Sequence, residues 1–160
     1  MDDSKVTVGR KRLVGPYDYG GWEVRTVAGL VLKIVADGVG LESDPRNFDS
    51  VVRIGEKWEE ITLASIYADD VARLSSRVKM PYERPPSDAT PLIVSDPIPS
   101  WRIELRDGVV LEIAADSYRP FGRWSEFSFR VADQGREWDE PVLFVRSKDL
   151  TSARVMSRPH

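Results

Sequence analysis

The sequence predicts an all-β fold, or a β-dominated α+β fold, made of two related units. Residues 22–37 recur 79 positions later as residues 101–116 (101 − 22 = 79). Within both stretches apolar and polar residues alternate, which is typical of strands that bury one face. Glycine-containing turns separate the alternating segments, as in sheets built from hairpins.

We interpret this recurrence as an internal duplication, because seven positions in it are identical where chance gives about one. The identical pairs are Trp22/Trp101, Gly29/Gly108, Val31/Val110, Leu32/Leu111, Ile34/Ile113, Ala36/Ala115 and Asp37/Asp116. The expected architecture is two meander units of about four strands that pack with pseudo-two-fold symmetry. Its predicted parts are a basic N-terminal arm (1–12), unit 1 (13–77), a proline-rich connector (78–91) and unit 2 (92–158).

The match between the two segments extends beyond residues 22–37 and 101–116, and the spacing between matched residues increases along the chain. Leu13 and Val14 match Leu92 and Ile93 at 79 residues. The spacing becomes 80 at Gly55/Gly135 and Trp58/Trp138, and 81 if residues 73–77 are matched to 154–158. A one-residue insertion in a loop is the expected cause. The flanking prolines Pro97 and Pro99 limit how far residues 92–94 can run as a strand.

The first hairpin of each unit can be predicted in detail. A three-residue loop at 106–108 pairs Leu105 with Val109, Ile103 with Leu111 and Trp101 with Ile113. All the apolar side chains of these pairs then lie on one face. The same loop at 27–29 pairs Trp22 with Ile34 and Val24 with Leu32. The last loop residue, Gly29 or Gly108, is expected in the left-handed conformation.

Three more segments are expected to complete each unit. Third strands are predicted at 51–54 and 127–131, and fourth strands from about 61–63 and 142–145. Residues 67–77 are compatible with a helix that Asp69 and Asp70 would begin, because Val71, Leu74 and the following Val78 have helical spacing. Residues 147–157 are less helical in composition. A short helix or a strand is expected to end each unit.

The composition narrows the chemistry. The chain has no cysteine and its single histidine is His160, so neither a thiol nor an imidazole is expected in a catalytic or metal site. We therefore expect no cofactor and no metal. No apolar stretch is long enough for a membrane span or a signal peptide, which favours a cytoplasmic protein without membrane contact. The net charge is −3, with +2 on residues 1–12 and −4 on residues 13–77.

A tryptophan followed by two acids occurs once in each unit, as Trp58-Glu59-Glu60 and Trp138-Asp139-Glu140. Carboxylates beside an aromatic ring could bind a sugar or a cation, or act in a glycosidase. The alternative is that each Trp packs at the start of its fourth strand and the acids face water. Because the triplet appears at matching places in both units, we favour inherited architecture. Its four acids remain candidate partner-binding residues.

The segment 117–124 has no close match in the first unit, where an acidic, glycine-rich loop stands instead. Loops that diverge on a repeated scaffold often carry function. The segment holds residue types enriched in interface hot spots. The candidate partner-binding residues here are Tyr118, Arg119, Phe121, Arg123 and Trp124. The alternative is that these rings cap one end of the core.

Two other motifs are weaker. Asp69-Asp70 lacks the spacing of a calcium-binding loop and is more typical of a helix start or a turn. Arg10-Lys11-Arg12, with Tyr17, Tyr19 and Trp22 downstream, could contact single-stranded nucleic acid. The acidic balance of unit 1 opposes that function, since it repels phosphates.

Three functions are compatible with these observations. The favoured one is a non-catalytic protein-binding module. In its most concrete form it is an inhibitor or immunity-type protein whose own acidic surface blocks a partner, for instance a basic enzyme. A structural subunit of a larger assembly, such as a phage particle or a secretion apparatus, is the alternative and implies a homo-oligomer. A carboxylate-based enzyme or a small-ligand-binding barrel is the third.

Overall fold

The computed structural model describes residues 21–81, 92–94, 98–133 and 135–156. Within these ranges thirteen strands form one mixed sheet, which confirms the all-β prediction. The strands are β1 (Gly21–Thr26), β2 (Val31–Ile34), β3 (Gly38–Val39), β4 (Arg46–Ile54), β5 (Lys57–Ile66), β6 (Val71–Val78), β7 (Leu92–Ile93), β8 (Ser100–Leu105), β9 (Val110–Ala114), β10 (Ser117–Phe121), β11 (Trp124–Asp133), β12 (Arg136–Arg146) and β13 (Leu150–Val155). The described residues include no helix long and apolar enough to cross a membrane.

Several sequence predictions fall outside these ranges. The basic arm 1–12, the pair Leu13 and Val14, the aromatic residues Tyr17 and Tyr19, and connector residues 82–91 are not among the described residues. The same holds for Pro97. The short β7 agrees with the expectation that proline limits this strand.

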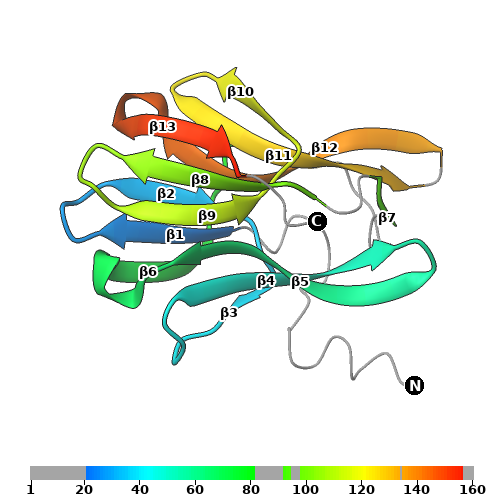
Figure 1. Ribbon diagram of the computed structural model, residues 1–160, viewed down its shortest axis with the longest axis horizontal. Helices are drawn as coiled ribbons and strands as arrows, with labels where there is room; N and C mark the ends of the chain where they lie inside the picture. The colour runs from blue at the N-terminus through cyan, green and yellow to red at the C-terminus, as the bar shows by residue number, and fades with distance from the viewer. Residues whose placement is uncertain (1–20, 82–91, 95–97, 134, 157–160) are drawn as a thin grey trace.

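The two units are joined through strand pairing (Figure 1). The sheet order is β13-β8-β9-β5-β4-β7-β11-β12-β2-β1-β6, with β3 beside β4 and β10 beside β11. The β1–β2 hairpin of unit 1 pairs with β12 of unit 2, at Ile34 opposite Leu143. The β8–β9 hairpin of unit 2 pairs with β5 of unit 1, at Ile113 opposite Ala64. Unit 1 thus contributes six of the described strands, β1 to β6, and unit 2 contributes seven, β7 to β13, more than the four expected of each. The first hairpin of each unit extends the other unit's sheet.

The spacing between matching strand pairs stays at 79 along the whole described chain, so the predicted drift to 80 and 81 is wrong. Ile54 pairs with Lys57, and Asp133 with Arg136 (133 − 54 = 79; 136 − 57 = 79). Both turns therefore hold two residues and no insertion separates the units. Glycine stands in the first turn position at Gly55 and in the second at Gly135, both with positive φ. Because the two glycines occupy different turn positions, alignment of Gly55 with Gly135 gives an apparent insertion of one residue.

The predicted first hairpins are confirmed. Trp22 pairs with Ile34 and Trp101 with Ile113, each closed by a three-residue loop. The last loop residues have φ of 95° at Gly29 and 89° at Gly108, as the bulged loop requires. The amide of Gly108 donates to the Leu105 carbonyl at 2.9 Å.

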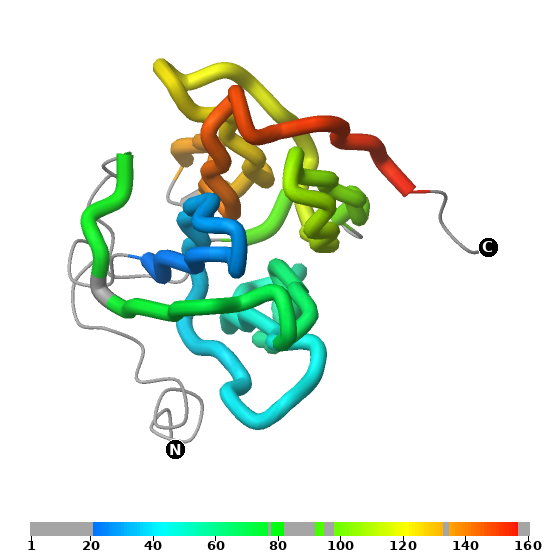
Figure 2. Tube along the Cα trace, turned by 90° about the vertical axis from the view of Figure 1, so that its left-hand side faces the viewer, coloured from blue at the N-terminus to red at the C-terminus, as the bar shows by residue number. Residues whose placement is uncertain are grey.

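The alternating apolar residues of both units meet in one hydrophobic cluster. It includes Val24, Leu32, Ile103, Leu111 and Phe127, each at most 1% exposed. Figure 2 shows the blue β1–β2 hairpin and the yellow-green β8–β9 hairpin seen end on, on either side of this interior. Each hairpin is anchored by its first tryptophan: the indole of Trp22 donates to the Ala36 carbonyl at 3.1 Å, and that of Trp101 to the Ala115 carbonyl at 2.9 Å.

The segments that end the units are strands, and the helical alternative for residues 67–77 is wrong. Asp69 and Asp70 lie in a single 3-10 turn, η1 (Ala68–Asp70), as the turn reading predicted. The chain then extends as β6 beside β1, with Leu74 opposite Val24. After the matching turn η2 (Ser147–Asp149), β13 pairs with β8 in the same way. Pairing with an existing edge satisfies a row of backbone amides, which outweighs the weak helical spacing.

A candidate binding platform on the outer face of the sheet

One side chain of β12 points away from the hydrophobic cluster although it is fully buried. Leu143 and Val145 belong to the cluster, whereas Phe144 between them does not. This follows from the alternation of side chains along a strand. Phe144 faces Lys33 on β2 and Glu126 on β11. Because Glu126 faces Arg119 on β10, the four side chains form one row across four neighbouring strands.

A second row lies beside the first. Trp124 begins β11 and pairs with Arg146 on one side and with Phe121 on the other. The turn Gly122-Arg123 connects Phe121 to Trp124, and the carbonyl of Arg123 accepts the Ser147 amide at 2.9 Å. We call this set the platform. Its members are Lys33, Arg119, Phe121, Arg123, Trp124, Glu126, Phe144 and Arg146.

The aromatic rings cover Phe144. The centroid of the Phe144 ring lies 6.0 Å from that of Phe121 and 6.3 Å from that of Trp124, the latter edge to face. Phe144 is 0% exposed, although no second layer of described strands is paired over it. A ring buried in this way contributes about 1.5–3 kcal/mol to folding. The platform is thus a small second core, closed by its own side chains.

Cations lie over the aromatic faces. The Arg146 guanidinium carbon is 4.9 Å from the Trp124 centroid, and the Lys33 Nζ is 5.8 Å from it. The Arg119 guanidinium carbon is 5.5 Å from the Phe121 centroid. All three distances lie within the range of cation–π attraction. The rings therefore hold these positive charges at defined places on the outer face.

Arg119 is held by a buried carboxylate. Its Nε donates to Glu126 Oε1 at 3.0 Å, with the Arg119 side chain 50% exposed and that of Glu126 0% exposed. The other oxygen, Oε2, is buried and has no hydrogen-bond partner among the described residues. A buried carboxylate requires a neutralising partner, since its desolvation is costly. Glu126 thus depends on Arg119, and Arg119 is fixed by Glu126.

The platform carries an excess of positive charge. Its members include four cations, Lys33, Arg119, Arg123 and Arg146, and one carboxylate, Glu126, which gives a net charge of +3. Lys33 Nζ donates to the Lys79 carbonyl at 2.7 Å, a neutral partner. Within the described part of the chain, Arg119 is the one platform cation that forms an ion pair with a carboxylate.

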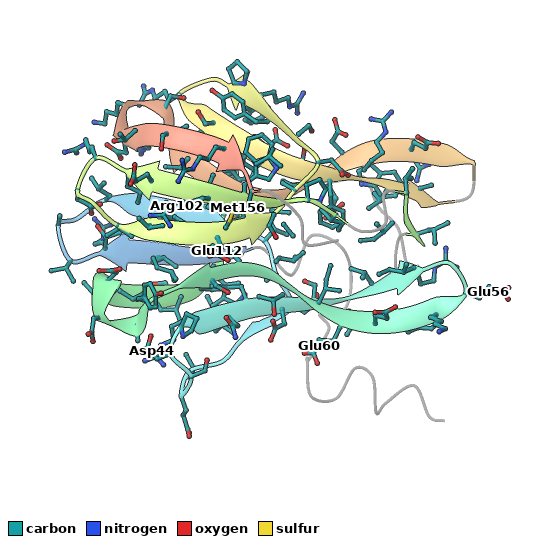
Figure 3. All side chains as sticks on the ribbon, viewed as in Figure 1. Asp44, Glu56, Glu60, Arg102, Glu112 and Met156 are labelled. Carbon is teal, nitrogen blue, oxygen red and sulfur yellow. The ribbon has the colours of Figure 1, made fainter. Side chains whose placement is uncertain are left out.

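The matching place in the other half of the sheet has different chemistry. The residues 79 positions from Phe144 and Glu126 are Ser65 and Asn47, which pair in register and hydrogen-bond at 2.7 Å. The residue matching Lys33 is Glu112, which lies opposite Ser65. Figure 3 shows Glu112 on β9, beside Arg102 on the neighbouring β8. The scaffold therefore does not require an aromatic and cationic surface here; particular side chains of one half create it.

The structure separates Tyr118 from the other predicted residues of its segment. Residues 117–124 are not a loop, because β10 pairs with β11 through the turn at Gly122 and Arg123. Along β10, Arg119 and Phe121 face the platform, whereas Tyr118 lies opposite Phe127. Its ring packs on Phe127 at 5.1 Å between centroids, on the core side, and remains 46% exposed. Tyr118 thus lies on the face opposite the platform, in contact with a core ring and partly exposed.

The two Trp-acid-acid triplets are not equivalent. With the constant spacing of 79, Trp58 matches Glu137 and Trp138 matches Glu59 (58 + 79 = 137; 59 + 79 = 138). Trp58 lies opposite Arg53 and is 54% exposed. Trp138 lies opposite Val131, packs against the core and donates to Glu140 Oε1 at 2.9 Å. The interpretation of the triplet as repeated architecture is therefore wrong.

The four candidate acids accordingly lie in different surroundings. Glu59 and Glu60 are exposed on β5, and Figure 3 shows Glu60 projecting away from the sheet. Glu140 is 5% exposed, so the predicted exposure to water does not hold for it. Asp139 accepts from Arg130 at 3.1 Å. Hydrogen bonding to Asp139, together with Glu137, raises the pKa of Arg130 above its ordinary value.

Sequence reasoning missed four platform residues: Lys33, Glu126, Phe144 and Arg146. Glu126 could have been found, because period-two reading from Phe127 back to Trp124 places Trp124 and Glu126 on one outward face. Phe144 could not be identified because it lies in a continuous apolar run, residues 142–145, in which every side chain is expected in the core. Lys33 and Arg146 come from separate units and meet only through the pairing of β2 with β12.

Among the described residues, no group of three or more His, Cys, Asp and Glu side chains is arranged to hold a metal ion. No protein-family model, curated protein or solved structure matches this chain.

Proposed function

We propose that this chain is a non-catalytic, cytoplasmic protein-binding module that contacts its partner through the platform. The observation that carries this proposal is the one-sided cluster of arginines held over aromatic rings, with a net charge of +3. Arginine and tryptophan are enriched among the residues that dominate binding energy at protein interfaces. The hairpin backbone and the rings fix these side chains in advance, which lowers the entropy lost on binding. The cytoplasmic location rests on composition.

The inhibitor or immunity-type role is a narrower form of this proposal. Its support is the presence of a preformed surface with a net positive charge. The surface that we propose for contact is basic, although the chain as a whole is acidic. The partner's contact surface is therefore expected to be acidic, opposite in sign to the basic enzyme suggested by the overall composition.

A photo-crosslinking experiment tests the proposal. A photoreactive phenylalanine analogue is placed at Arg123, which is exposed in the β10–β11 turn, and separately at exposed Trp58 on β5. The expected result is one discrete crosslinked partner from the Arg123 position, lost when Trp124→Ala and Arg146→Ala are added. A crosslink that persists after these two substitutions, or that forms only at Trp58, would contradict a platform interface.

A structural subunit is the second candidate, favoured by the two ends of the sheet. Among the described strands, β6 pairs only with β1 and β13 only with β8. Edge strands can pair with another chain, although the chain reduces this tendency with irregular register in both pairs and with Arg73 and Arg154. Concentration-dependent self-crosslinking or filaments of the purified protein would favour this role over a separate partner.

A further inference from the structure

The platform's chemistry indicates what kind of segment it accepts; this inference rests on the proposed function. Arg123 and Arg146 form no ion pair with a carboxylate among the described residues, and Lys33 forms none although Glu23 lies opposite it on β1. Uncompensated cations that are fixed in position attract groups of opposite charge and favour those that can approach closely. The ligand is therefore expected to be anionic.

Arg119 is prepared to bind one specific anionic group. Its Nε is occupied by Glu126, while its two terminal nitrogens make no hydrogen bond to any described residue. The side chain is half exposed, and contact with Phe121 restricts the guanidinium plane. A planar guanidinium held in this way presents paired N–H donors that match a carboxylate. Glu126 is thus a positioning residue for Arg119.

The rings themselves are poorly placed to bind nucleic-acid bases. Stacking of a base requires an open aromatic face. Both Arg146 and Lys33 lie over Trp124, and Arg119 lies over Phe121. The chain also has a net charge of −3, which repels a long polyanion at low salt. These observations favour a short acidic peptide over single-stranded nucleic acid.

We infer that the platform binds an acidic segment of the partner protein, whose carboxylates pair with Arg119 and with Arg146. The rings orient the arginines, and Glu126 fixes the direction of Arg119. The surface requires no counterpart in the other half of the sheet, where Glu112, Ser65 and Asn47 occupy the matching positions.

The test uses the full chain and a fluorescein-labelled hexaglutamate peptide, with binding followed by fluorescence anisotropy at low salt (about 50 mM). The unmodified chain is expected to bind the peptide, and added salt to weaken binding. Arg119→Ala and Arg146→Ala are each expected to weaken binding roughly fivefold or more. Arg119→Lys, which keeps the charge and loses the planar donors, is expected to weaken it as well.

Arg130→Gln is the matched control, because Arg130 lies on β11 with 46% exposure but pairs with Glu137 and Asp139 outside the platform. Its affinity for hexaglutamate is expected to stay within about twofold of the unmodified chain. Melting curves show which variants are folded; if Arg119→Ala unfolds, Arg119→Lys and Arg146→Ala decide the result.

Three outcomes would overturn the inference. The first is an equal loss in Arg130→Gln, which would indicate general attraction of charge. The second is binding of labelled oligothymidine without binding of hexaglutamate, which would assign the platform to nucleic acid. The third separates this inference from the proposed function: an Arg123 crosslink to a partner that excess hexaglutamate does not reduce would retain the platform as an interface and reject the acidic segment.

Discussion

Trp58 and Trp138 face opposite sides of matching hairpins, because Trp58 lies opposite Arg53 and Trp138 lies opposite Val131. Glycine is the first residue of the β4–β5 turn, at Gly55, and the second residue of the β11–β12 turn, at Gly135. The tryptophan that follows three residues after each glycine is therefore displaced by one position between the two hairpins. A shift of one residue moves a side chain to the other face of a strand.

Replacement of the two tryptophans is therefore expected to have unequal effects. Trp138→Ala removes a ring packed on the core and the donor to Glu140, and we expect a loss of about 2–4 kcal/mol in the free energy of unfolding. Trp58→Ala removes a ring that is 54% exposed, and we expect a loss below about 1 kcal/mol. Urea unfolding measures both; equal losses would contradict the register described above.

Phe144→Ala tests whether the platform is a second core. Phe144 is fully buried under Phe121 and Trp124, so we expect a loss of about 3–5 kcal/mol in unfolding free energy. The matched control is Ser65→Ala at the corresponding position of β5, which removes one hydrogen bond to Asn47 and should cost about 1 kcal/mol. A loss for Phe144→Ala no larger than for Ser65→Ala would show that the rings do not cover it.

The Arg119–Glu126 pair should respond differently to loss of each partner. Arg119→Ala leaves the Glu126 carboxylate buried without its cation, and we expect a loss of roughly 1–3 kcal/mol in stability. Glu126→Gln removes the buried charge and keeps an oxygen that can accept from Arg119, but it places an amide nitrogen where Oε2 has no partner, so we expect a separate loss of about 1 kcal/mol.

The double variant separates these effects in thermal or urea unfolding. Once Glu126 is Gln, Arg119→Ala should cost less than it does in the unmodified chain, because no buried charge remains. An Arg119→Ala loss that is the same in both backgrounds would contradict coupling between the two side chains.

Gly108 provides a test of the hairpin loop. Its φ is 89°, and a Cβ added there would meet no other atom within 4 Å, so strain arises from the backbone alone. Gly108→Val is expected to cost about 1–2 kcal/mol. Gly108→Asn should cost less, because asparagine adopts the left-handed region more readily. Melting temperatures of the two variants check this order, and an equal decrease would contradict the left-handed assignment.

The first hairpins could be predicted residue by residue because their constraints are local. Alternation assigns a face to each side chain, and only a three-residue loop keeps Trp101, Ile103 and Leu105 on the same face as their partners. The terminal strands could not be predicted with the same success. Asp69 and Asp70 fit a helix start as well as a turn, and pairing of Leu74 with Val24 decided between them.

The candidate site was predictable only in part. Arg119, Phe121 and Trp124 could be predicted from their residue types and from the absence of a match to 117–124 in the first unit. Lys33, Phe144 and Arg146 could not, because they come from other strands, β2 and β12. Tyr118 belonged to the same segment but lies on the core side, because neighbouring strand residues alternate between faces.

The sequence by itself determined the all-β class, the two first hairpins and their glycine loops, since these depend on side-chain alternation and on backbone conformation within about a dozen residues. Tertiary structure decided that the β1–β2 hairpin pairs with β12 and the β8–β9 hairpin with β5. The first of these pairings places Lys33 opposite Phe144. Tertiary structure also decided that Trp138 packs against the core and that Trp58 is exposed. These outcomes depend on contacts between residues far apart in the chain, and a local pattern carries no information about which edges will pair.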